Sequence, residues 1–169
     1  KASFHYYLIQ DYIFLMHFTR AWALAVVKSE TLTEMKLAAS TVDALINHEM
    51  QLHVDTCKKI GISEDELFQA EEAVANLAYT RFVMDAGLSG DFIDLMAALA
   101  PCIFGYAEIG LTLAKSATPN TPYQNWIDTY ACDEYQDLCN TLGAMIEQAA
   151  LSRIGPDPMA SPRWTSLCK

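Results

Sequence analysis

The chain has 169 residues, of which 52% are hydrophobic, and this predicts one globular domain with a sizeable core. The formal net charge is −10, from 21 acidic and 11 basic residues, without a cluster of Lys and Arg. A nucleic-acid-binding surface needs such a basic patch, so we expect no nucleic-acid partner. Polar residues interrupt the apolar segments, so we also expect none of them to span a membrane.

The first half of the chain predicts three helices. They are expected at 3–28, at 32–59 with an end at Gly61, and at 63–86 with an end at Gly87. The third begins at Ser63 and has Glu66 three residues later, which is the pattern of a capping box. A break inside this third segment is compatible with the pattern.

The second half predicts two more helices. They are expected at 91–117, ended by "TPNTP" at 118–122, and at 122–153 with room for a bend at 131–133, before a loop "GPDPMASP". Strand alternation is absent, so the fold class is all-α. Helices of about 26 residues are roughly 39 Å long, which favours a bundle of long antiparallel helices in a single domain, 1–169.

Asp11 lies inside the apolar stretch "YYLIQDYIFLMHF", on a helix face shared with Tyr7, Phe14 and Phe18. Burying an unpaired carboxylate is costly. One interpretation is therefore an Asp that is hydrogen-bonded to a neighbouring helix. The other is an acceptor for a cationic or N–H-rich ligand, with Phe14 as a stacking wall.

Pro101 lies within a continuous helical pattern, "LAPCIFGYAEIG", where we expect it to kink the helix. Cys102 follows at once, and Tyr106 is one turn further on the same face. Kinked helices often border pockets, although a free cysteine is more often a small buried core residue. Gly105 and Gly110 allow another element to approach closely.

The five cysteines, Cys57, Cys102, Cys132, Cys139 and Cys168, form no CxxC pair and no zinc spacing. Free thiols in a reducing, cytoplasmic environment fit this pattern. "NHEMQLH" has the spacing HExxxH, one residue too long for a zincin, and no ExxH di-iron pattern occurs. All four histidines lie in the first third of the chain. We therefore expect no metal and no cofactor.

Together these segments resemble the thiaminase II (TenA) family, cysteine-type aminopyrimidine aminohydrolases with a haem-oxygenase-like all-α bundle. The resemblance rests on "FHYYLIQDYIFLMHF", "HEMQLH", "AYTRF" with "LSGDF", "LAPCIFGYAEIG" and "YQNWIDTYACDEYQ", in order along nearly the whole chain. The most specific features are the Pro-Cys inside a helix with Tyr at i+4, and the Trp-Ile-x-x-Tyr of the last helix.

The resemblance implies a role for each matching residue. Cys102 is the expected nucleophile, and Tyr79 lies beside its sulfur. Asp11 accepts hydrogen bonds from an aminopyrimidine, Phe14 and Tyr106 sandwich the ring, and Tyr130 binds a ring nitrogen. The implied activity belongs to thiamin salvage: release of hydroxymethylpyrimidine from thiamin or from aminomethylpyrimidine breakdown products. The family also implies a homotetramer and a small-molecule pyrimidine as the partner.

Two departures from the family pattern leave alternatives open. Phe14 stands where family members commonly carry Tyr, and the family's acid/base glutamate lies on a helix beyond "SPRWTSLCK". Relative to the family we expect roughly one helix to be missing at each end, with Glu49 and Glu108 as other carboxylates. A pyrimidine-binding or regulatory protein without catalysis is therefore the main alternative. A metal oxygenase of the same shape is disfavoured by the histidine distribution.

Overall fold

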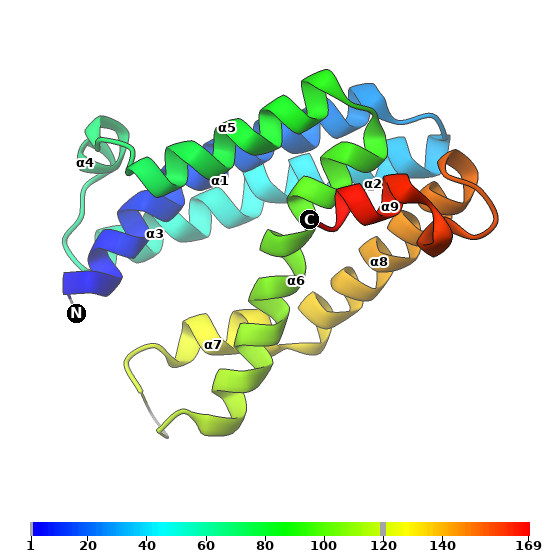
Figure 1. The fold of residues 1–169 in the computed structure, drawn as a ribbon. Helices are drawn as coiled ribbons and strands as arrows, with labels where there is room; N and C mark the ends of the chain where they lie inside the picture. The colour runs from blue at the N-terminus through cyan, green and yellow to red at the C-terminus, as the bar shows by residue number, and fades with distance from the viewer. Residues whose placement is uncertain (1, 119–120) are drawn as a thin grey trace. The chain divides into compact units, whose positions relative to one another are not determined.

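The computed structural model describes residues 2–118 and 121–169 (Figure 1). This part of the chain is helical and contains no strand, which confirms the all-α fold class. It forms two compact units, one up to Leu95 and one from Met96, and each is described by itself. That the chain is one domain stays a prediction. Residues 119–120 of the expected "TPNTP" stop lie outside the described residues.

The first unit consists of helices around the long helix α1. Its elements are α1 (Ala2–Lys28), α2 (Leu32–Ala44), the π-helical turn η1 (Leu45–Glu49), α3 (Met50–Lys59), α4 (Glu64–Gln69) and α5 (Val74–Ser89). Figure 1 shows α5 and α3 running alongside α1, with which both are in contact. The predicted helix 32–59 thus exists, but it contains a π turn that the sequence pattern did not indicate.

One core cluster of this unit lies where α1, α3 and α4 meet. Its buried members are Leu8, Cys57, Ile62 and Leu67. A Leu or Ile side chain contributes roughly 1.5–3 kcal/mol when fully removed from water, so this cluster stabilises the packing of α3 and α4 on α1. Gly61, with φ of 90°, follows α3 in the left-handed conformation that ends many helices.

The expected capping box at the start of α4 is present. The hydroxyl of Ser63 accepts a hydrogen bond from the N–H of Glu66 at 3.2 Å, and the Glu66 carboxylate accepts one from the N–H of Ser63 at 2.8 Å. The N–H and hydroxyl of Ser63 both donate to this carboxylate, and they lower the pKa of Glu66 below its ordinary value.

Gly87 does not end the third predicted helix, and this expectation was wrong. Helix α5 continues to Ser89, and a Cβ at Gly87 would come within 2.7 Å of the Leu24 side chain and 2.9 Å of the Leu95 side chain. The glycine therefore provides space for close packing inside the helix. The expected break did form earlier, between α4 and α5.

The second unit begins within α6 (Phe92–Ser116). It continues with α7 (Gln124–Ala131), α8 (Asp133–Arg153), the 3₁₀ turn η2 (Pro158–Ala160) and α9 (Pro162–Leu167). The break between α7 and α8 confirms the expected bend at 131–133. The loop expected at 155–162 is largely confirmed. It contains the short turn η2, and α9 begins at its last residue, Pro162, where the Ser161 hydroxyl accepts a hydrogen bond from the N–H of Arg163.

Helix α6 contradicts the expectation that polar residues break every apolar segment. Over 18 residues its mean hydropathy reaches 1.6, and its 25 residues are long enough to cross a membrane by length and composition. In the structure, 44% of that window is buried inside the protein. Core helices of globular proteins have the same properties, so composition alone does not assign α6 to a bilayer.

Candidate functional site

The six predicted site residues fall into two groups, one in each unit. Asp11, Phe14 and Tyr79 belong to the first unit, whereas Cys102, Tyr106 and Tyr130 belong to the second.

Asp11 is nearly enclosed, with its side chain 11% exposed. Its Oδ2 lies 3.6 Å from Nδ1 of His53 on α3, and the Tyr7 side chain one turn earlier forms a hydrogen bond with it. Asp11 thus contacts a neighbouring helix through His53, but at 3.6 Å this contact is longer than a hydrogen bond, and the hydrogen bond with Tyr7 lies within α1. Both interpretations of the sequence therefore stay predictions.

The pKa of Asp11 is raised from 3.8 to about 7. Burial is the largest cause, the nearby Glu49 charge acts in the same direction, and the hydrogen bond with Tyr7 opposes them. Burial also raises the pKa of Glu49, and burial together with the Asp11 charge raises that of Cys57 to about 11. A buried residue with such a perturbed pKa is a candidate for a functional role.

Phe14 and Tyr79 meet across α1 and α5. Their ring centroids are 6.1 Å apart, and the two ring planes are nearly parallel, at an angle of 16° to each other. Phe14 also stacks with Phe18, at 5.2 Å. The structure therefore brings together Phe14 and Tyr79, which the sequence reasoning assigned to one site, and such pairs contribute about 0.5–1.5 kcal/mol beyond their buried area.

Gln10 fixes the start of the helix that carries Tyr79. Its amide nitrogen donates to the carbonyl oxygen of Glu71 at 2.9 Å, and its amide oxygen accepts from the N–H of Ala73 at 2.8 Å. Its backbone oxygen accepts from the Asn76 side chain at 2.9 Å. The residues between α4 and α5 lack helical hydrogen bonds, and this single side chain supplies two replacements.

The connector is also held by its own Glu72, which contacts α1 and α5. The Glu72 carboxylate accepts a hydrogen bond from Arg81 at 3.1 Å and lies 3.5 Å from Nε2 of His17. The hydroxyl of the buried Thr80 donates to the same carboxylate at 3.2 Å. Burial lowers the pKa of His17, with Arg81 and Arg20 acting in the same direction and Glu72 in the opposite one.

In the second unit, Cys102 and Tyr106 lie one turn apart on α6, and both are partly exposed. The helix continues through Pro101, so the proline does not end it; a kink at this position stays a prediction. The expected close approach occurs at Gly110, where a Cβ would lie 2.7 Å from the backbone carbonyl carbon of Tyr130. At Gly105, a Cβ would have no neighbouring atom of the described residues within 4 Å.

Tyr106 and Tyr130 are in contact, with ring centroids 4.8 Å apart. Trp126 completes this aromatic cluster, 6.0 Å from Tyr106 and 4.8 Å from Tyr130. The Gln136 amide on α8 donates a hydrogen bond to the carbonyl oxygen of Tyr130 on α7 at 2.9 Å and stabilises the turn between the two helices. Tyrosines from two different helices, α6 and α7, are thus in direct contact.

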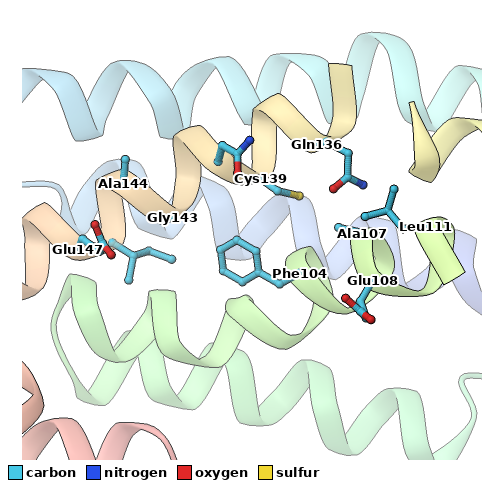
Figure 2. A pocket seen from close by; sticks show the side chains of 11 residues that line it. Phe104, Ala107, Glu108, Leu111, Gln136, Cys139, Gly143, Ala144 and Glu147 are labelled. Atoms are coloured by element: carbon cyan, nitrogen blue, oxygen red, sulfur yellow. The ribbon is translucent and has the colours of Figure 1, made fainter. Parts of the chain in front are cut away.

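A separate open hollow of about 640 Å³ lies between α6 and α8 (Figure 2). Phe104 and Glu108 from α6 and Cys139 and Glu147 from α8 are among the side chains that line it. None of the six predicted site residues does. Glu108, one of the alternative carboxylates, therefore borders this hollow.

Within residues 2–118 and 121–169, no group of three or more His, Cys, Asp or Glu side chains could hold a metal ion. His53, which the sequence reasoning considered only as a metal ligand, instead pairs with Asp11 from 42 positions away. The sequence analysis assigned no role to Gln10, the residue before Asp11. Spacing along one helix cannot reveal either contact, because both join separate helices.

Comparison with known proteins places these features in a family. Residues 1–152 match the model described as the TENA/THI-4/PQQC family. A solved structure described as a TenA family transcription regulator from Silicibacter sp. TM1040 is 54% identical, with a TM-score of 0.95 over 99% of this chain and 74% of its own. The chain thus has the all-α, haem-oxygenase-like fold of that family.

Two curated relatives extend the comparison. The "Aminopyrimidine aminohydrolase" of Halalkalibacterium halodurans is 36% identical over 152 residues, which cover 89% of this chain and 68% of the relative. An uncharacterized protein of Haemophilus influenzae is 45% identical over 138 residues, 80% of this chain and 64% of the relative. The chain thus spans about two thirds of the length of these relatives. It belongs to the TENA/THI-4/PQQC family.

Proposed function

We propose that this protein is a hydrolase of thiamin metabolism that releases hydroxymethylpyrimidine from thiamin or from aminomethylpyrimidine breakdown products. The observation that carries the proposal is the 36% identity to an aminopyrimidine aminohydrolase over 89% of the chain. The contacts of the predicted residues support it, because Phe14 stacks with Tyr79 and Tyr106 touches Tyr130.

In the proposed reaction, Cys102 is the nucleophile. Its thiolate adds to the pyrimidine ring, and the electron pair released through the ring expels the leaving group from the exocyclic methylene. Water adds to that methylene and the thiolate departs. For aminomethylpyrimidine, the net reaction consumes one water and releases one hydroxymethylpyrimidine and one ammonia. A free thiol is only a few per cent ionised near pH 7, so the site must activate Cys102.

The other residues would bind and orient the ring. Asp11 would bind the amino-substituted edge of the pyrimidine, and Tyr130 a ring nitrogen. Phe14 and Tyr106 would stack on its faces, and Tyr79 would lie beside the Cys102 sulfur. Stacking and hydrogen bonding of this kind place the reacting methylene in one orientation, which is how binding contributes to rate.

The test is an assay of the purified protein with thiamin and with aminomethylpyrimidine as separate substrates. Hydroxymethylpyrimidine, quantified by mass spectrometry, is the expected product, and ammonia should appear in equal amount from the amine. Tight binding of either compound without product would contradict the hydrolase.

A second candidate function is a pyrimidine-binding regulator without catalysis. The name of the 54% identical Silicibacter protein, a transcription regulator, favours it, and so does Phe14 in place of the Tyr common in the TenA family. Calorimetry beside the assay separates the two. A regulator should bind hydroxymethylpyrimidine and leave thiamin intact, whereas an enzyme should turn the substrate over.

We also propose a cytoplasmic homotetramer with a pyrimidine as its small-molecule partner, without nucleic acid or membrane. The family resemblance and the scattered acidic charge support this part of the proposal. Sedimentation velocity should give four times the monomer mass. A monomer at micromolar concentration would contradict the tetramer.

A further inference from the structure

The His53 ring contacts both Asp11 and the backbone of α1, the helix that carries Asp11. Nε2 of the His53 ring lies 2.7 Å from the carbonyl oxygen of Leu8 on α1, and Nδ1 lies 3.6 Å from Oδ2 of Asp11. His53 is 9% exposed and Asp11 is nearly as enclosed. The two side chains therefore meet in a protein environment rather than in water.

The Leu8 contact fixes the tautomer of the ring. A carbonyl oxygen can only accept, so Nε2 must carry the hydrogen and donate it. In the neutral ring, Nδ1 then has a lone pair, and that lone pair faces Asp11. Burial lowers the pKa of His53, which favours this neutral ring over the imidazolium.

The groups that act on Asp11 come from three elements. Tyr7 on α1 forms a hydrogen bond that favours the carboxylate, whereas the Glu49 charge from η1 disfavours it. On α3, Cys57 is held as a neutral thiol and His53 presents an acceptor. With burial as the largest effect, the pKa of Asp11 is raised to about 7, so the neutral carboxylic acid is a main species near neutrality.

The protonation of Asp11 decides which pattern of hydrogen bonds it offers. The edge of a neutral 4-aminopyrimidine has an amino donor beside a ring-nitrogen acceptor. A carboxylic acid has a carbonyl acceptor beside a hydroxyl donor, so the two edges match with two hydrogen bonds. A carboxylate offers two acceptors, and one of them would face the lone pair of the ring nitrogen.

We propose, given the pyrimidine-binding function above, that Asp11 binds the aminopyrimidine as a neutral carboxylic acid and that His53 is the positioning residue that maintains this form. The unprotonated Nδ1 places no positive charge beside the carboxyl, and the Leu8 hydrogen bond keeps the ring in that orientation. Substrates that carry a donor–acceptor pair at this edge are selected. Analogues with a hydrogen in place of the amino group lose one of the two bonds.

The first experiment measures the affinity for hydroxymethylpyrimidine by calorimetry between pH 7 and 9. For the wild-type protein, affinity should fall tenfold per pH unit above the Asp11 midpoint. Asp11→Asn presents an amide donor and a carbonyl acceptor in place of the acid. It should retain affinity within about tenfold of the wild type at pH 7 and lose the pH slope, because an amide does not titrate. A loss above a hundredfold in Asp11→Asn, or a flat wild-type profile, would overturn the proposal.

His53→Gln separates positioning from structural support. Its amide nitrogen can still donate to the Leu8 carbonyl oxygen, but no ring nitrogen faces Asp11. The midpoint of the affinity profile should move to lower pH, because no nitrogen lone pair then faces the carboxylate. A purely structural role would lower affinity equally at every pH and contradict the assignment. Asp55→Asn removes an exposed carboxylate from the same helix and should leave the profile unchanged.

Nuclear magnetic resonance of the ligand-free protein completes the test without any dependence on binding or turnover. The ¹³C shift of the Asp11 carboxyl should titrate with a midpoint near pH 7, and the ¹⁵N shifts of His53 should report hydrogen on Nε2. A midpoint near pH 4 would overturn the proposal even if pyrimidine binds. If no pyrimidine binds at all, the proposed function fails, while these shifts still report on the Asp11–His53 pair.

Discussion

The amide of Gln10 bridges the backbone of Glu71 and that of Ala73, donating to the first at 2.9 Å and accepting from the second at 2.8 Å. Helix α4 ends at Gln69 and α5 begins at Val74, so these bonds replace the helical ones that the connector lacks. One polar side chain on α1 thereby sets where α5 starts. Because α5 carries Tyr79, the same contact fixes the position of the ring that stacks on Phe14.

Removing the Gln10 amide should loosen this connector. Gln10→Ala leaves an N–H and a carbonyl oxygen without their partners, and we expect a loss of about 1–3 kcal/mol in the free energy of unfolding. Urea unfolding followed by circular dichroism measures it. Gln51→Ala, which removes an exposed side chain that donates to Asp55, should change stability by less than about 0.5 kcal/mol. Equal effects of the two substitutions would contradict the role of Gln10.

Close packing at Gly110 should make that position intolerant of a methyl group. Gly110→Ala places Cβ 2.7 Å from the backbone of Tyr130, so we expect a loss of about 1–3 kcal/mol and a disturbed contact between the Tyr106 and Tyr130 rings. Gly105→Ala, on the same helix with no atom within 4 Å, should be neutral or stabilise by up to about 1 kcal/mol. Thermal unfolding of both variants checks the contrast, and a destabilised Gly105→Ala alone would contradict it.

The elements that local sequence signals control were predictable. The capping box at Ser63, the end of α3 before Gly61 and the break at Cys132 each depend on residues within a few positions of one another. The errors come from contacts between distant residues. Gly87 is an apparent helix stop, but Leu24 and Leu95 use its missing side chain for packing. The end of α4 depends on Gln10, about 60 positions away.

For the candidate site, the family resemblance assigned residues to one site without predicting which of them touch. Phe14 stacks with Tyr79, and Tyr106 touches Tyr130, and each pair joins two helices. Spacing along one helix gives no partner on another, so the sequence could not predict these contacts, and the expected sandwich of a ring between Phe14 and Tyr106 stays a prediction. The surroundings of Asp11 could not be predicted in the same way. His53, Glu49 and Cys57 approach it from η1 and α3, and their positions follow from how α3 packs on α1.

Asp11 should make the protein less stable as the pH rises. Its pKa is 3.8 in an unfolded chain and about 7 in the fold, so the folded state binds more protons between these values. The relative stabilisation is fully present below pH 3.8 and is lost as the pH rises to about 7. Asp11→Asn removes this dependence. The free energy of unfolding of the variant, minus that of the wild type, should therefore increase by up to about 4 kcal/mol as the pH rises from 4 to 8.

Urea unfolding at several pH values gives this difference. The subtraction removes the contributions of titratable groups that do not interact with Asp11. A difference that is constant from pH 4 to pH 8 would show that Asp11 has an ordinary pKa in the fold.

The central claim is that the Cys102 thiol carries out hydrolysis of an aminopyrimidine. The most direct measurement compares the rate of hydroxymethylpyrimidine release by the wild-type protein, Cys102→Ser and Cys168→Ser, where Cys168 is an exposed cysteine outside the candidate site. We predict that Cys102→Ser loses at least about a thousandfold in rate while Cys168→Ser keeps wild-type turnover. Wild-type turnover by Cys102→Ser, with its fold confirmed by circular dichroism, would contradict the account.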